Sequence, residues 1–229
     1  MADGFLPPKQ ERSRAALARL LRATIHTLDA RGLEGATIPA IAAAAGVAPA
    51  GIYRRFRDRD SLYRAALLAT LESSAAATQQ SLDVEAFEER SLEGVFSRVV
   101  TITMQPYHTH PGLMRALTRF IETDTDASFR TRALEVVRGN FERLTEVILA
   151  FRNEITHKDP RAAITFALLT MATLVEVHAL EKVSMWHELL PLTDDQVHGE
   201  VTRTCVAYLQ SSEAARARAH PRATHPRKR

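Results

Sequence analysis

Tyr53, Arg54 and Arg55 stand side by side in the N-terminal quarter of the chain, and Arg59 follows four residues later. Guanidinium groups bind phosphates and guanine edges with paired hydrogen bonds, and a tyrosine hydroxyl can donate to a phosphate. This combination is typical of contact with a nucleic acid. An alternative stays open for each residue, since Tyr53 could pack between helices and the arginines could simply be solvated.

The residues before this group predict two short helices joined by a tight turn. Thr37 is suited to cap a helix that ends near Ala45, and its hydroxyl or the neighbouring amides could also touch phosphate. Gly46 can take up the left-handed conformation that a turn requires. A further helix is expected from Ala48 or Pro49 to Phe56. Two such helices form a helix-turn-helix, whose second helix can enter the major groove of DNA.

Spacing along the second short helix separates an inward from an outward face. Ile52 and Phe56 should pack inward with Ile41 and Val47 of the preceding segment. The outward face then carries the residues expected to meet DNA. These DNA-contacting residues are Thr37, Pro49, Ala50, Tyr53, Arg54, Arg55 and Arg59.

Residues 11–64 closely resemble the DNA-binding domain of the TetR family of transcriptional regulators. The matching positions are Gly32-Leu33, Thr37, Ile41-Ala42, Ala45-Gly46-Val47, Tyr53, Phe56, Asp58-Arg59 and Leu62. Ala48 replaces the serine usual in the family, and Gly51 offers no side chain where threonine or serine is common. The resemblance therefore assigns specificity to Tyr53, Arg54, the apolar surfaces of Pro49 and Ala50, and the shape of the DNA.

Helical periodicity continues along the rest of the chain, so the predicted fold class is all-α. We expect an N-terminal three-helix helix-turn-helix domain and a larger C-terminal helical domain for ligand binding and dimerisation. The expected division is a flexible N-terminus 1–10, a DNA-binding domain 11–64, a ligand-binding and dimerisation domain 65–212, and a disordered basic tail 213–229. The predicted helices cover 11–31, 38–45, 49–56, 59–73, 83–104, 112–122, 126–152, 160–182 and 193–211, with a link at 105–111 broken by two prolines.

Charge is divided unevenly along these segments. The net charge is +5 over residues 1–64, −7 over 65–212 and +5 over 213–229, although the whole chain carries only +3. A basic head suggests a polyanionic partner, whereas chance asymmetry in an arginine-rich chain is the alternative. The expected partner is double-stranded DNA with a palindromic operator.

The helix at 160–182 is apolar nearly all round, which predicts packing on two sides. The family resemblance implies that helices near 160–182 and 193–211 form a homodimer interface, and that the other helices enclose a site for a small, largely apolar effector. Simple core packing is the alternative for each pocket residue taken singly. The candidate lining consists of Phe96, Val100, Met104, Met114, Phe120, Phe166, Thr170 and His178.

Other functional classes receive little support from the residues. Cys205 is a single cysteine without a neighbouring base, and there is no glycine-rich phosphate loop, so no enzyme and no cofactor are expected. His108, His110 and His178 are too few and too scattered for a metal site. The uncharged run 162–175 is shorter than a membrane span. The expected function is a cytoplasmic, ligand-released repressor, and the alternative is a DNA-organising or scaffold protein with the same head and no ligand response.

Overall fold

The computed structural model describes residues 9–81, 91–181, 183 and 185–211. These residues form helices without any strand, which confirms the all-α fold. The predicted basic tail 213–229 lies outside the described residues. So does the predicted N-terminal segment 1–10, apart from residues 9 and 10, which begin the first helix.

The chain divides into two compact units. The first comprises the described residues of Met1–Thr78 and Pro106–Arg138, and the second those of Gln79–Gln105 and Gly139–Arg229. The first unit therefore contains the whole region 11–64 in which DNA binding was expected, and in addition residues 106–138.

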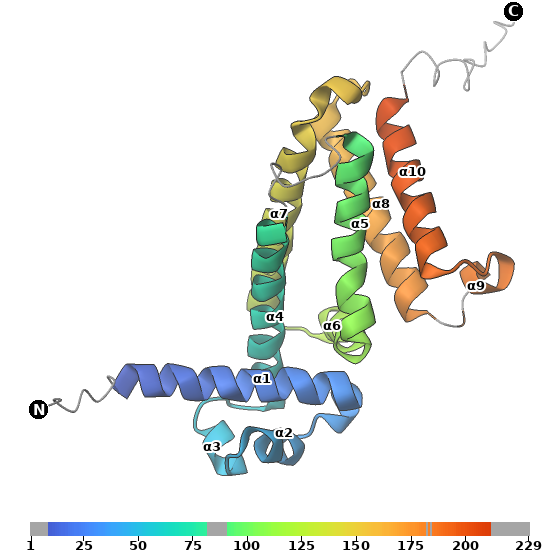
Figure 1. Cartoon of the computed structure of the whole chain (residues 1–229). Coiled ribbons are helices and arrows are strands. Elements are labelled where there is room, and N and C mark those ends of the chain that lie inside the picture. Colours follow the sequence, from blue (N-terminus) through green and yellow to red (C-terminus); the bar gives the residue numbers. More distant parts are fainter. Residues whose placement is uncertain (1–8, 82–90, 182, 184, 212–229) are drawn as a thin grey trace, which may run out of the picture. The chain divides into compact units, whose positions relative to one another are not determined.

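Seven helices of the described residues contribute to the first unit, three of them only in part. They are α1 (Lys9–Gly35), α2 (Ile38–Ala45), α3 (Pro49–Tyr53), α4 (Arg59–Ser81) as far as Thr78, the last turn of α5 (Leu92–Thr109) from Pro106, α6 (Pro111–Thr123) and the beginning of α7 (Ala127–Leu149) (Figure 1). Gly32, with φ of 66°, interrupts the helical geometry of α1 close to the predicted end at residue 31. Beyond it the chain turns towards α2.

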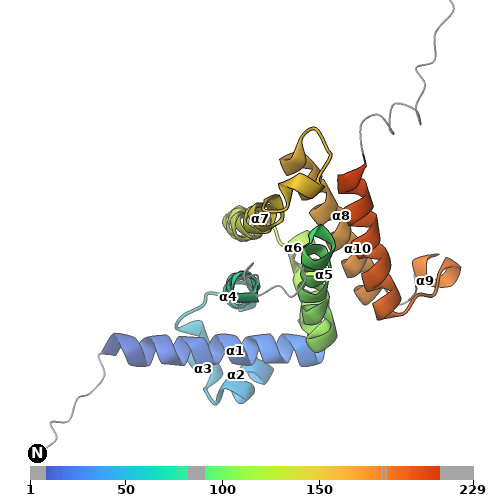
Figure 2. The same ribbon diagram turned by 45° about the horizontal axis from the view of Figure 1, so that its top comes forward.

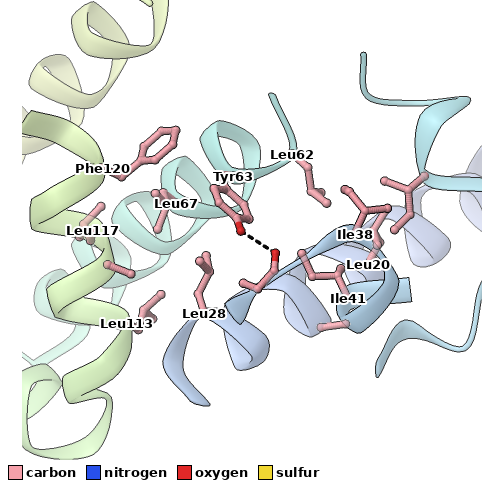
Figure 3. Packing of buried hydrophobic residues seen from close by; sticks show 14 of the residues in the cluster. Leu20, Leu28, Ile38, Ile41, Leu62, Tyr63, Leu67, Leu113, Leu117 and Phe120 are labelled. Carbon is pink, nitrogen blue, oxygen red and sulfur yellow. Dashed lines mark hydrogen bonds between the residues drawn. The ribbon is translucent and has the colours of Figure 1, made fainter. Parts of the chain in front are cut away.

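The core of the first unit gathers apolar side chains from α1, α2, α4 and α6 around Tyr63 (Figure 3). The Tyr63 side chain is almost fully buried, and its hydroxyl lies 2.5 Å from the carbonyl oxygen of Ala36 and 3.0 Å from that of Leu33. Its ring meets the Phe120 ring edge to face, with centroids 5.8 Å apart. This arrangement packs α4 against α6 and links α4 to the C-terminal end of α1 and the start of the segment that leads to α2.

The second unit contains the remaining helical segments. They are the last residues of α4 from Gln79, α5 as far as Gln105, the rest of α7, a short 3-10 helix (Arg152–Glu154), α8 (Pro160–Leu180), α9 (Met185–Leu189) and α10 (Asp194–Gln210). Helices α8 and α10 pack side by side, as both ribbon views show (Figures 1 and 2). Between them, the buried thiol of Cys205 donates to the carbonyl oxygen of Ala167 at 3.6 Å.

Four predictions about helix bounds were wrong. Helix α3 ends at Tyr53 rather than at Phe56. Helix α5 continues through Pro106 to Thr109, because a proline removes one hydrogen bond but leaves later residues able to pair, as His110 N does with Pro106 O. Helix α4 extends to Ser81 rather than 73, with Ala75 buried. The segment between the predicted helices 160–182 and 193–211 contains the short helix α9, in which Trp186 is 36% exposed. The predicted beginning of α5 at residue 83 lies outside the described residues.

Helix α8 has two apolar faces. Ile164, Leu168 and Val175 are completely buried, whereas Phe166 and Leu169 are more than half exposed. By length and composition alone, α8 could also cross a membrane, as no other helix of the described part could. Its buried face shows that one side packs within the second unit.

Candidate nucleic-acid interface

Helix α2 is held at both ends by the residues that the sequence singled out. The Thr37 hydroxyl accepts a hydrogen bond from Ala40 N at 3.4 Å, and Pro39 occupies the first turn, where a missing N–H costs little. Gly46 ends the helix in the left-handed conformation, with φ of 65°. Thr37 itself is exposed, which leaves it free to approach a phosphate.

Helix α3 turns one face into the core and the other to solvent. Ile52 is fully buried together with Ile41, and Val47 and Phe56 pack against the same core, as predicted. Ala42 and Ala45 are buried as well, which lets the two short helices pack closely.

The outward face of α3 carries the side chains proposed to read DNA. Tyr53 is 56% exposed, and Pro49, Ala50, Arg54 and Arg55 are exposed too. Ala48 occupies the N-cap position without a side-chain hydrogen bond, and its methyl group is too small to obstruct the approach to the first turn of α3. We call this surface, formed by Pro49, Ala50, Tyr53, Arg54 and Arg55, the α3 face.

A contact that sequence reasoning missed holds one of these arginines. Both terminal nitrogens of Arg55 lie 3.3 Å from the hydroxyl oxygen of Ser13, a residue of α1 forty-two positions earlier. No sequence pattern signals such a contact between exposed side chains on different helices. It restricts Arg55 to the side of the α3 face that adjoins the first turns of α1.

Helix α4 begins beside this surface with a well-formed cap. The Asp58 carboxylate accepts a hydrogen bond from Ser61 N at 2.7 Å, which with the Arg57 guanidinium lowers the pKa of Asp58 to about 2. Arg59 follows, with its guanidinium 3.5 Å from Asp60 and above the Tyr63 ring at 5.4 Å from the centroid. Asp60 offsets the charge of Arg59 at the positive end of the helix, and the half-exposed Arg59 side chain can still reach an anion.

The eight predicted pocket residues do not share one environment. Met114 and Phe120 belong to the first unit and the other six to the second. Phe96, Val100, Met104, Phe120 and His178 are buried, and Met114 and Thr170 are half-buried. Phe166 is 57% exposed, with its ring 5.3 Å from that of Tyr208.

His178 has a more specific setting than its sequence position suggests. Its Nε2 lies 2.8 Å from a carboxylate oxygen of Asp194, and its ring stacks on that of His187 at 5.1 Å. Its Nδ1 is buried without a hydrogen-bond partner. Among the described residues, no three histidine, cysteine or acidic side chains gather closely enough to hold a metal.

The helix-turn-helix matches a known family. Residues 20–66 fit the family model for bacterial regulatory proteins of the tetR family. No curated protein is significantly similar to the chain.

Solved structures have a similar fold over most of the chain. The FadR transcriptional regulator from Bacillus subtilis, in complex with stearoyl-CoA, is 13% identical, with 84% of this chain and 97% of that chain covered and a TM-score of 0.60. A TetR transcriptional regulator from Rhodococcus sp. RHA1 is 18% identical, with 86% and 97% covered and a TM-score of 0.55. RolR, solved with resorcinol, is 16% identical, with 92% and 95% covered and a TM-score of 0.54. At these identities the similarity shows the fold.

Proposed function

We propose that this chain, a TetR-family DNA-binding regulator by its helix-turn-helix and its fold, binds a palindromic operator as a homodimer and releases it when a small ligand binds the C-terminal helices. The observation that carries the proposal is the α3 face. Tyr53 is exposed at the end of α3, Arg54 and Arg55 are exposed in the turn that follows, and the opposite side of the helix is buried. This arrangement suits insertion into the major groove.

The proposal assigns roles to the residues of the α3 face and to Thr37 and Arg59 beside it. Tyr53 and Arg54 contact base edges or phosphates, and the small side chains of Pro49 and Ala50 let the helix approach the bases closely. Arg55, held by Ser13, contacts the backbone on the side of α1. Thr37 and Arg59 bind phosphates at the N-terminal ends of α2 and α4, where the helix dipole favours an anion.

The exposed apolar residues of α8 support the dimer. Phe166 and Leu169 lie on the face opposite the buried core of α8, and Phe166 contacts Tyr208 of the neighbouring α10. Apolar side chains on such a face gain free energy when a second copy covers them. In the proposal, α8 and α10 of two subunits pack together, and the apolarity of α8 serves this interface rather than a membrane.

The effector is proposed to be small and largely apolar. FadR from Bacillus subtilis and RolR, which share this fold, were solved with stearoyl-CoA and resorcinol respectively. The candidate lining in this chain is dominated by apolar and methionine side chains, which adapt to irregular ligands. Phe166 fits the dimer face better than an enclosed lining because of its exposure. We expect the protein to act in the cytoplasm as a repressor, without catalysis.

Selection of bound duplexes from a random-sequence pool tests the DNA part. The expected product is a palindrome whose half-site centres lie about one helical turn, roughly 34–36 Å, apart. Equal binding to unrelated duplexes, or tight binding by a monomer, would contradict the proposal.

The ligand part is tested on the selected operator. Compounds that raise the melting temperature are added to the protein–operator complex, and DNA release is measured. Ligand and DNA must weaken each other by the same factor, a coupling of about 1–3 kcal/mol. If a tight ligand leaves DNA affinity unchanged, the scaffold alternative is favoured instead.

A further inference from the structure

A groove lies in the first unit between the C-terminal end of α1 and helix α6. Its volume is about 350 Å³, within the range of roughly 300–1,000 Å³ that ligand sites occupy. Residues 29–34 line one side, and Gly112, Arg115 and Arg119 contribute to the other. The groove is separate from the α3 face and from the proposed apolar lining, none of whose residues borders it.

The two helices approach each other very closely at Gly112, one of the residues that line the groove. A Cβ atom at Gly112 would lie 1.9 Å from the backbone oxygen of Asp29, so only glycine fits there. The Asp29 side chain accepts a hydrogen bond from Leu113 N at 2.9 Å and lies 2.9 Å from His110 Nδ1. These contacts fix the first turn of α6 against α1.

The helical period then places two arginines along the same side of α6. Arg115 and Arg119 follow Gly112 at i+3 and i+7, one and two turns farther along. Arg31 lines the groove from α1. Three arginines from two helices therefore line one small volume.

These three guanidinium groups have no partner in the part of the chain that the structure describes. Neither a hydrogen bond nor an ion pair engages the side chains of Arg31, Arg115 or Arg119 there, and all three residues are exposed. Of the two carboxylates at the groove, Asp29 already pairs with His110 and the backbone, and contacts with His110 and Leu113 N hold its pKa below the usual value against the opposing effect of burial. Asp29 and Glu34 supply two negative charges against three positive ones, so the lining residues keep a net charge of +1.

We propose that this groove is a binding site for a small oxyanion with more than one negative charge, held by Arg31 from α1 and by Arg115 and Arg119 from α6. Guanidinium groups bind phosphate and carboxylate oxygens in paired, planar hydrogen bonds, which explains why three of them gather where no protein carboxylate meets them. A ligand that bridges α1 and α6 stabilises the native state by mass action. The groove is thus a second effector site, which binds an anionic ligand rather than an apolar one.

Titration of the full-length protein with pyrophosphate and with citrate tests the site, with sodium chloride at equal ionic strength as the reference. Melting temperature and calorimetric affinity are measured for each. We expect at least one of the two anions to bind and to raise the melting temperature above the sodium chloride reference, and their relative affinities identify the source as phosphate or carboxylate. The double variant Arg115→Gln with Arg119→Gln should bind that anion at least tenfold more weakly.

A matched control removes the same charge elsewhere. Arg98→Gln with Arg138→Gln changes two exposed arginines that do not line the groove, and it should keep the affinity for the anion. Equal weakening in both double variants would mean that only net charge matters, and would overturn the proposal. Failure of both anions to bind the wild type would overturn it too. Unchanged binding of both anions by the Arg115→Gln, Arg119→Gln variant would also overturn it.

Discussion

Arg55 and Arg59 present their guanidinium groups to the surface in different ways. Arg55 is held by the hydroxyl of Ser13 on α1, and Arg59 lies between Asp60 and the ring of Tyr63. Tyr53 and Arg54, which directly precede Arg55, have no such hydrogen bond or ion pair among the described residues. We therefore expect side chains that contact bases to be separable from those that only bind phosphate.

Replacing Tyr53 or Arg54 with alanine should weaken binding to the selected operator by about 1–3 kcal/mol each, since each is proposed to contact base edges. Arg59→Ala should instead weaken binding to all duplexes alike and reduce the salt slope by about 1, because one phosphate contact is lost. Affinities on the operator and on an unrelated duplex, measured over a range of salt concentrations, separate the two effects. An unchanged slope for Arg59→Ala would exclude a phosphate contact there.

Single-residue orientation in the helix-turn-helix was predictable, but contacts of long side chains were not. The period of a helix decided that Ile52 is buried and Tyr53 exposed. It could not show that Ser13 holds Arg55, because that contact joins two exposed side chains on separate helices. Exposure of Phe166 was likewise not evident, since α8 is apolar on both sides and periodicity cannot distinguish its core face from its outer face.

At the level of elements, the contact between α1 and α6 depends on one glycine. Gly112→Ala should destabilise the protein by about 1–3 kcal/mol, because the new methyl group meets the backbone oxygen of Asp29, which cannot move aside as a side-chain end could. Thermal or urea unfolding measures the change.

Gly139→Ala provides the control for that substitution. This glycine lies within α7, where an added Cβ would meet only the end of Arg143 at 4.0 Å. Alanine there should leave stability unchanged or raise it by up to about 1 kcal/mol, since alanine favours a helix. Equal effects of the two substitutions would mean that Gly112 is not a point of close contact.

A buried ion pair joins α4 to the end of α6. Two nitrogens of Arg64 donate to the Asp124 carboxylate at 2.6 and 2.8 Å, and the Asp124 side chain is only 6% exposed. The hydrogen bonds from Arg64 hold the pKa of Asp124 below its usual value, against the opposing effect of burial. The pair therefore stabilises the folded state most where the unfolded carboxyl is already ionised.

Asp124→Asn should lower stability near pH 6 by about 1–3 kcal/mol, as expected for a lost hydrogen bond to a charged group. The difference from wild type should shrink as the pH falls from about 4, the unfolded pKa, through the lower folded pKa, because the wild-type carboxyl is then protonated. Urea unfolding at a series of pH values measures it. Glu72→Gln, in the exposed pair with Arg132, should have little effect at any pH.

Helix existence was easier to predict than helix length. Eight of the ten α-helices of the described residues correspond to predicted spans that begin or end within a few residues, with the exceptions of α5 and α9. Residues 74–81 of α4 lack an apolar stripe, so periodicity did not indicate that the helix continues, although the three alanines at 75–77 favour a helix. Pro106 was taken to end α5, yet the turn after it still pairs.

At the scale of the whole molecule, the proposed dimer depends on the exposed apolar face of α8 that carries Phe166 and Leu169. Leu169→Glu should raise the dimer dissociation constant by about thirtyfold or more, the effect of losing a contact worth at least about 2 kcal/mol at the centre of an interface. Analytical ultracentrifugation measures it. Leu134→Glu, at a comparably exposed leucine of α7, should leave the dimer intact. Equal dissociation of both variants would place the interface elsewhere.

The thiol between α8 and α10 has a practical consequence. Burial raises the pKa of Cys205 to about 11, so only about one thiol in a thousand would be ionised at pH 8. Because it is the only cysteine in the chain, the rate at which a disulfide reagent modifies it reports how often the two helices separate. A cysteine placed at an exposed position such as Leu134 would react much faster, which allows a single fluorophore to be attached to the native protein without first removing Cys205.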